Sequence, residues 1–134
     1  MVRGLRYAQE FDPLEQDAEL TGQLDYNSTW SAFRAPEIDS EFVYNEKVDL
    51  WSLGATIYML LTGSPPFGGG GIDSISMKRE SPVRFGSGVL PSEDVQALIR
   101  GLLQTDPRRR LTLEEVRQHP WFEEPDEPPE FMEK

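Results

Sequence analysis

The most constraining feature of this sequence is a largely apolar stretch of about 14 residues, 48–61. It is apolar on nearly every face of a helix, whereas a surface helix has an apolar stripe and a polar back. It is shorter than the roughly 20 residues that cross a bilayer. The stretch therefore predicts a buried central helix of a soluble domain. Its exception is Asp49, a carboxylate that needs hydrogen-bond donors to offset the cost of its desolvation.

Length, charge and residue usage narrow the classes of protein to which the chain can belong. At 134 residues it has the size of one domain. Its net charge of −11 argues against nucleic acid and anionic membranes as partners. There is no cysteine and a single histidine, His119, so disulfides and thiolate metal sites are excluded and no metal site is expected. Residues 1–20 contain no apolar run of signal-peptide length, and we expect a cytoplasmic protein.

Local signals around the central stretch predict where its helix begins and ends. Asn45 can cap the start of the helix, and Gly63 stands where a C-cap glycine is expected. Upstream, Pro36 opens a short helical turn, because proline is tolerated at a first helical position.

The sequence pattern of the second half of the chain predicts three more helices. A short one spans 72–80, and an amphipathic one spans about 92–104, with apolar residues on one face. Thr112 and Glu115 form a capping box at the start of the last helix. The aromatic pair at 121–122 is expected to fold back onto the core. The sequence thus indicates a mainly α fold.

Four short motifs occur in order along the chain. They are Ala-Pro-Glu at 35–37, Asp-Leu-Trp-Ser-Leu-Gly at 49–54, Leu-Leu-Thr-Gly-Ser-Pro-Pro-Phe at 60–67, and Asp-Pro-Arg-Arg-Arg-Leu-Thr at 106–112, which leads to His-Pro-Trp-Phe at 119–122. In this order and at these separations they closely resemble the C-terminal lobe of eukaryotic serine/threonine protein kinases. The third motif and the final tetrapeptide look most like the calcium/calmodulin-dependent-kinase-like group.

The resemblance implies a mainly α fold, the helical subdomain of a protein-kinase C-lobe, without the N-lobe and without the catalytic loop. It covers residues 34–122. Residues 1–33 are then expected to form a partly disordered segment that resembles an activation segment, and the acidic residues 123–134 a disordered tail.

The resemblance also implies structural roles for named residues. Glu37 resembles the glutamate that closes the activation segment, and Arg110 resembles its arginine partner, with which a carboxylate can pair bidentately. Asp49 resembles the core-helix aspartate that accepts backbone N–H bonds from the catalytic loop, which would explain a carboxylate in an apolar helix. The other residues of the family motif are expected to serve packing rather than chemistry: Ala35, Pro36, Trp51 and Gly54.

The parts that carry kinase chemistry are missing from the sequence. Phosphoryl transfer needs a glycine-rich loop and a lysine for ATP, a His-Arg-Asp loop with its asparagine, and an Asp-Phe-Gly aspartate for magnesium. None of these occurs, and Val2 and Arg3 occupy the place of Asp-Phe when the stretch 4–13 is aligned with the family. The glycine run 68–71 lacks the flanking strand and lysine-initiated helix of a phosphate loop, so it is interpreted as a flexible loop. We therefore expect no catalytic residue and no cofactor in this chain, although the intact family uses ATP and Mg.

The loop that seats a peptide substrate in the family is altered here. Trp30 lies five residues before the alanine of the Ala-Pro-Glu motif, where active members usually carry threonine. Together with Ser31 and Phe33 it forms the candidate substrate loop. Ser28 and Thr29, and by position Ser31, are candidate phosphorylation sites; the alternative is that these are ordinary turn hydroxyls.

Two functions are implied by the resemblance. The first is a partial serine/threonine protein kinase domain that is inactive as an isolated chain. The second is a truncated pseudokinase that acts as a scaffold or protein-interaction module. The expected partners are a protein substrate or a partner kinase, and the missing N-terminal kinase half if the chain is a fragment. Because elements that precede this chain cover one side of the central helix in the family, we expect that side to present an apolar patch.

Overall fold

The computed structural model describes residues 29–40, 44–68, 72–88 and 90–123. Within these ranges every regular element is helical, which confirms the mainly α fold. The elements are the 3-10 helices η1 (Thr29–Phe33) and η2 (Pro120–Phe122) and the α-helices α1 (Pro36–Ser40), α2 (Lys47–Thr62), α3 (Ile72–Glu80), α4 (Glu93–Leu102) and α5 (Leu113–Arg117).

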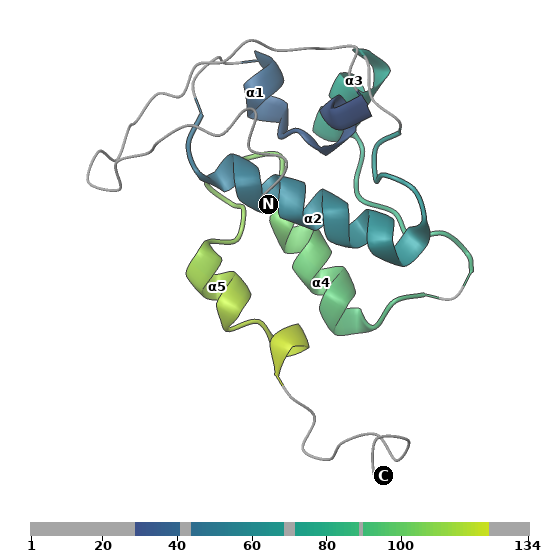
Figure 1. Ribbon diagram of the computed structural model, residues 1–134, viewed down its shortest axis with the longest axis vertical. Coiled ribbons are helices and arrows are strands. Elements are labelled where there is room, and N and C mark those ends of the chain that lie inside the picture. The colour runs from purple at the N-terminus through teal and green to yellow at the C-terminus, as the bar shows by residue number, and fades with distance from the viewer. Residues whose placement is uncertain (1–28, 41–43, 69–71, 89, 124–134) are drawn as a thin grey trace, which may run out of the picture.

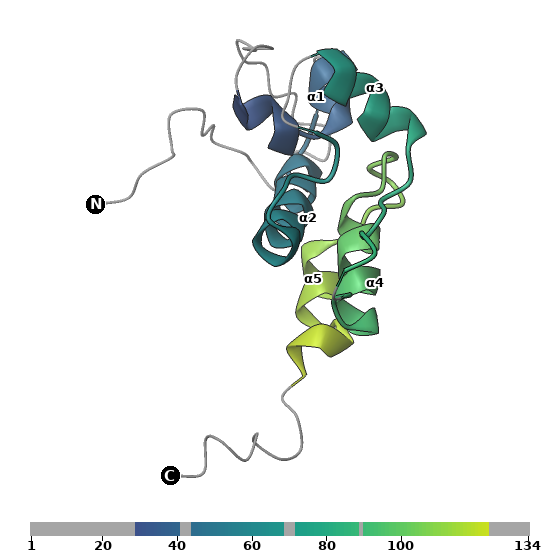
Figure 2. The same ribbon diagram turned by 90° about the vertical axis from the view of Figure 1, so that its right-hand side faces the viewer.

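Helix α2 runs through the centre of the fold (Figure 1). Helix α4 packs against it, with α5 next to α4, and α1 and α3 lie together at the upper end of the molecule (Figures 1 and 2). Within the described part of the chain, no helix combines the length and the apolar character that a membrane span requires.

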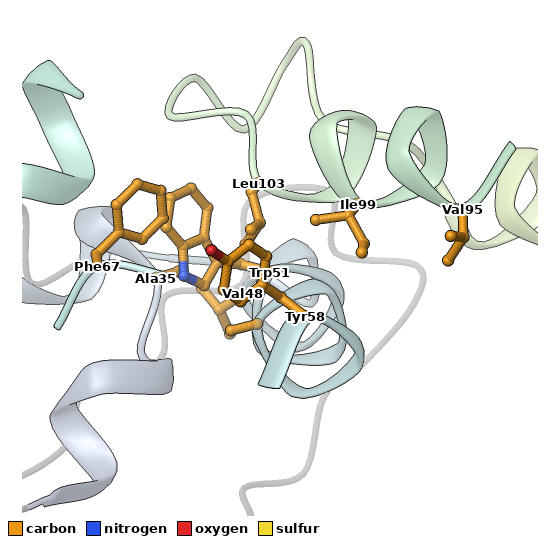
Figure 3. Packing of buried hydrophobic residues seen from close by; sticks show 9 residues of the cluster. Ala35, Val48, Trp51, Tyr58, Phe67, Val95, Ile99 and Leu103 are labelled. Atoms are coloured by element: carbon orange, nitrogen blue, oxygen red, sulfur yellow. The ribbon is translucent and has the colours of Figure 1, made fainter. Parts of the chain in front are cut away.

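The larger group of core side chains is built around Trp51. Its ring stacks on Phe67, with the ring centroids 5.7 Å apart (Figure 3). Farther along α2, the ring of Tyr58 packs against Phe85 at 5.4 Å, and its hydroxyl donates a hydrogen bond to the carbonyl of Arg84 at 2.7 Å. Helix α4 and the residue after it contribute three buried side chains to this group: Val95, Ile99 and Leu103.

Helices α2 and α4 approach each other closely at a glycine. A Cβ atom added to Gly54 would lie 2.7 Å from the Cβ of Leu102, so any larger residue would push the helices apart. This contact explains why a glycine is needed inside an otherwise apolar helix. Beside it lies a second group of core side chains that joins α2, α4 and α5: Leu50, Leu98, Leu102 and Val116, with Leu111 packed against them.

The ends of α2 lie close to the local signals of the sequence. The N-cap residue is Glu46, whose side chain makes no capping hydrogen bond, rather than the expected Asn45; the side chain of Asn45, one residue earlier, accepts a hydrogen bond from the backbone N–H of Lys47 at 3.1 Å. At the other end Gly63 has a φ of 82°, and its N–H donates to the carbonyl of Met59. A residue with a Cβ is strained in this left-handed conformation, which is why glycine ends the helix.

The starts of the two later helices are also as predicted. Ser92 accepts a hydrogen bond from the N–H of Val95 at 3.4 Å. Thr112 and Glu115 form the complete capping box, because each side chain accepts a hydrogen bond from the other's backbone N–H. Helix α4 ends at Leu102, two residues before the expected boundary.

Two expectations about burial are met only in part. The segment η2 packs against α4, so Trp121 and Phe122 fold back onto the core, but they lie edge to face on each other and remain 38% and 50% exposed. Helix α2 contacts η1 and α4 and is buried on the side that carries Trp51, but not on the opposite side. Four apolar side chains of the helix are exposed, and we call them the α2 apolar face: Leu53 and Leu60, on the side opposite Trp51, and Met59 and Leu61, on either side of Leu60 near the end of the helix.

The boundary expected at residue 33 lies inside the described range 29–40, and the one expected at residue 123 lies at the end of the last described range. Residues 29–33, the last part of the segment expected to be partly disordered, form η1. The rest of that segment and the tail from 124 lie outside the described residues.

Candidate functional site

The residues of the family motif converge on one buried ion pair. Glu37, the second residue of α1, lies against Arg110, which comes eight residues after the end of α4. Nη1 of Arg110 donates to Oε1 of Glu37 at 2.6 Å, and Nη2 donates to Oε2 at 3.0 Å. Both residues are almost completely buried. The contact is therefore bidentate and shielded from water, the geometry in which a guanidinium and a carboxylate bind most specifically.

Arg110 makes more contacts than the ion pair requires. Its Nε and Nη2 donate to the carbonyl of Gln104, and its Nη1 also donates to the carbonyl of Lys47 at 2.8 Å. Its guanidinium carbon lies 5.1 Å from the centroid of the Trp51 ring, within the range of a cation–π interaction. One side chain thus joins α1, the first turn of α2 and the end of α4.

The backbone around Arg110 is fixed by a second cation. The turn after α4 is closed by hydrogen bonds from the N–H groups of Arg109 and Arg110 to the carbonyl of Asp106. The ammonium of Lys47 then donates to the carbonyls of Pro107 and Arg110 at 2.9 and 3.3 Å. Lys47 and Arg110 therefore hold each other's backbone, and α2 cannot shift along this turn without breaking both sets of contacts.

The other motif residues pack around this pair. Ala35 is fully buried in the core group that contains Trp51 and Phe67, and Pro36 is the first residue of α1. Gly54 lies in the close contact between α2 and α4. Asp49, by contrast, is among the exposed residues of α2.

Asp49 does not receive the hydrogen bonds that the resemblance implies, as far as the described residues go. None of them donates to its carboxylate, and residues 1–28 lie outside the described ranges. Partial burial, and to a smaller extent the neighbouring Glu46 carboxylate, raise the pKa of Asp49 above its ordinary value. Asp49 is thus a weakly destabilising charge at the start of the exposed side of α2.

The described half of the candidate substrate loop is held by its backbone. Ser31 is buried, and its carbonyl accepts hydrogen bonds from the ammonium of Lys78 at 2.5 Å and from the N–H of Arg34 at 3.3 Å. The carbonyl of Phe33 accepts from the hydroxyl of Ser52 at 2.9 Å. Two neighbouring elements, α3 and α2, therefore each fix one carbonyl of η1.

The candidate phosphorylation sites are placed only in part. Ser31 is buried, so its hydroxyl is inaccessible to another kinase unless η1 opens. Ser28 lies outside the described residues, as do the side chains of Thr29 and Trp30, although the backbone of the last two belongs to η1.

Among the described residues, no three histidine, aspartate or glutamate side chains lie together as a metal site requires. The histidine, His119, caps η2 by accepting a hydrogen bond from the N–H of Trp121. In this part of the chain the arrangement positions helices and a loop, and the side chains that it brings together are suited to structure rather than to chemistry.

Three residues that the sequence did not single out take part in this arrangement: Lys47, Lys78 and Gln104. Gln104 acts through its carbonyl, which no side-chain pattern reveals. Lys78 follows Ile75 by three residues, a spacing that places the two positions on the same face of a helix.

Removal of either member of the buried pair should lower the stability of the fold far more than removal of a surface pair. We expect Glu37→Ala and Arg110→Ala each to lower the free energy of unfolding by about 3–5 kcal/mol, because each leaves a buried charge without its partner. The double variant should lose less than the sum of the two losses. Urea unfolding measures these values. The control is Arg108→Ala, which breaks the exposed bond to Asp106 and should cost less than about 1 kcal/mol; equal losses in the buried and exposed variants would contradict the assignment.

The raised pKa of Asp49 predicts a pH-dependent effect of its replacement. The carboxyl group of Asp49 binds its proton more tightly in the folded state than in the unfolded chain. The stability that this protonation confers is therefore lost as pH rises through the raised pKa. Asp49→Asn should therefore stabilise the protein at about pH 7 and have little effect at about pH 3. Thermal unfolding at the two pH values measures this.

Asp106 supplies a control with the opposite sign. Hydrogen bonds from Arg108 lower the pKa of Asp106. The ionised carboxylate therefore stabilises the folded state above the ordinary pKa of aspartate, and this stabilisation is lost as pH falls through the lowered pKa. Asp106→Asn should destabilise the protein near neutral pH only. If both asparagine variants shift the melting temperature in the same direction at neutral pH, the electrostatic account of Asp49 is wrong.

Comparison with known proteins agrees with this geometry. The family model of the protein kinase domain matches residues 15–122. Over 95 residues the chain is 39% identical to MAP kinase-activated protein kinase 2 of Homo sapiens, a match that covers 66% of this chain and 24% of that protein. It is 38% identical over 110 residues to the Aurora kinase of Schizosaccharomyces pombe, which covers 82% of this chain and 29% of the relative.

A third relative is serine/threonine-protein kinase SIK1 of Rattus norvegicus, 36% identical over 100 residues that cover 72% of this chain and 13% of the relative. The matched region thus spans less than a third of the length of each of these curated relatives. The family model, however, covers most of the chain and includes both members of the buried pair. From this match and the helical arrangement around Glu37 and Arg110, we conclude that the chain belongs to the protein kinase domain family.

Proposed function

We propose that this chain is the helical C-lobe portion of a serine/threonine protein kinase domain of the calcium/calmodulin-dependent-kinase-like group. The observation that carries the proposal is the buried Glu37–Arg110 pair, which ties the Ala-Pro-Glu motif to the turn before the last helices. In the whole domain the reaction is transfer of the γ-phosphoryl group of ATP to a protein hydroxyl. The partners that we propose are a protein substrate or a partner kinase, in the cytoplasm.

We further propose that the chain by itself does not catalyse this transfer. Catalysis of phosphoryl transfer consists almost entirely of positioning and electrostatic stabilisation of the phosphates and magnesium. The sequence holds neither the glycine-rich loop, nor the His-Arg-Asp loop, nor the Asp-Phe-Gly aspartate that do this in the family. The retained part shapes η1 and α1, the elements on which a peptide substrate would lie.

Incubation with labelled ATP and magnesium tests this proposal. We expect no label on casein or on the chain itself, because the groups that orient the phosphates are lacking. Full-length human MAP kinase-activated protein kinase 2, assayed in parallel, is the positive control. We also expect no rise in melting temperature with ATP and magnesium, since a ligand that binds the native state must raise it. Transfer that co-purifies with the chain over successive columns, together with such a rise, would contradict the proposal.

A second candidate function is that of an interaction module, a pseudokinase scaffold. The α2 apolar face favours it: Leu60 is 80% exposed, and Leu53, seven residues earlier, lies on the same side of the helix. Contiguous exposed apolar surface of this kind marks an interface or an aggregation hazard. In this case the face would bind an apolar segment of a partner kinase, in the place where the preceding elements of a kinase domain would pack.

Binding of a hydrophobic dye tests whether the α2 apolar face is accessible in solution. Leu60→Gln should lower the dye fluorescence of the native chain severalfold, because it places a polar group in the middle of the face. Leu113→Gln, at an exposed leucine on α5, is the matched control and should lower it less. A monomeric chain that binds no dye would contradict the interaction module.

Mapping the 5′ end of the transcript separates the two candidates. A reading frame that continues upstream into a His-Arg-Asp loop supports the partial kinase domain. Initiation at Met1 supports the scaffold.

A further inference from the structure

Lys78 is a buried cation that the proposed function does not use. It lies on α3 and is only 1% exposed, which is rare for lysine, because a buried ammonium must find acceptors to replace water. One acceptor is the carbonyl of Ser31, at 2.5 Å from Nζ, 47 residues earlier in the chain. Ser31 is as deeply buried as Lys78. The contact therefore lies inside the fold, between α3 and η1.

The carbonyl that Lys78 binds lies where the chain leaves η1. The same oxygen accepts the N–H of Arg34, the bond that turns the chain from η1 toward α1. Farther along, Ser52 of α2 binds the carbonyl of Phe33. Without Lys78, η1 would be fixed to α2 at its last residue but not to α3 through the carbonyl of Ser31.

The backbone of Lys78 is itself anchored. Its carbonyl accepts a hydrogen bond from the hydroxyl of Thr105 at 3.0 Å. Thr105 is the residue after Gln104, whose carbonyl binds the guanidinium of Arg110. Lys78 thus connects η1, through α3, to the turn that holds the buried ion pair. Figure 1 shows α1 and α3 side by side at this end of the molecule.

We propose that Lys78 is a positioning residue whose ammonium group sets the path of η1, so that α3 and the candidate substrate loop form one surface. That this surface binds a peptide substrate rests on the proposed function. The physical reason is that an apolar side chain of the same volume can fill the space of Lys78 but cannot hold a carbonyl oxygen. The role therefore resides in the charge and its hydrogen bond rather than in packing.

The variant Lys78→Met separates these two roles, because it retains the volume and removes the ammonium. The carbonyl of Ser31 keeps the hydrogen bond from the N–H of Arg34 when the ammonium is lost, so the melting temperature should fall less than it does in Arg110→Ala. Amide hydrogen exchange of residues 31–34 should nevertheless become at least about tenfold faster, because η1 opens locally. A matched control is Lys47→Met, which removes bonds to the carbonyls of Pro107 and Arg110 and should leave exchange at 31–34 unchanged.

Chemical rescue gives a readout that packing alone cannot produce. The chain has no cysteine, so the variant Lys78→Cys can be alkylated at a single site while unfolded and then refolded. Aminoethylation restores an ammonium at nearly the position of Nζ, and propylation gives an uncharged side chain of the same length. We expect the aminoethyl form to restore slow exchange at residues 31–34 and the propyl form to leave it fast, with similar melting temperatures.

Two results would overturn the proposal: slow exchange in the propylated form, or unchanged exchange in Lys78→Met. Either would show that Lys78 only fills space. These measurements report on the order of η1 whether or not the chain transfers phosphate. A failure of the positioning role is therefore distinguishable from a failure of the proposed function.

Discussion

The guanidinium of Arg110 is the group on which the arrangement of this fold depends. It is removed from water, and each of its donor groups meets an acceptor: the carboxylate of Glu37 and the carbonyls of Gln104 and Lys47. A buried ion pair adds little net stability when desolvation is counted, yet its loss leaves several groups unsatisfied at once. Its effect is specificity, because only one placement of α1, α2 and the turn after α4 satisfies all of these groups.

This arrangement explains how a chain without the catalytic motifs of the family keeps the shape of a kinase lobe. The pair positions α1, and the hydrogen bonds from Ser52 and Lys78 position η1 next to it. The α2 apolar face lies apart from these contacts, because Leu53 and Leu60 are on the side of the helix opposite Trp51. One helix thus helps to position η1 and also exposes apolar side chains.

The features that the sequence could predict are those decided by short-range interactions. The capping box of Thr112 and the left-handed Gly63 are decided within a few residues, so local pattern was sufficient. The pairing of Glu37 with Arg110 was accessible only through the resemblance to kinases. The resemblance predicted an exposed apolar patch on one side of α2, but periodicity could not predict that Leu60 belongs to it, because apolar residues occur on every side of this helix. The burial of Lys78 depends on the elements that lie across from α3, which composition and spacing do not encode.

The separation of Glu37 and Arg110 by 73 residues has a consequence for how the chain folds. Contacts between distant residues must close a long loop before they stabilise anything, and such closure slows folding. During synthesis α1 and α2 leave the ribosome well before Arg110 does. Until then Glu37 is exposed to water, and the apolar residues of α2 are not yet covered by α4. The nascent chain therefore passes through a stage in which both sides of α2 are open, and such stages are the ones at which chains aggregate or engage chaperones.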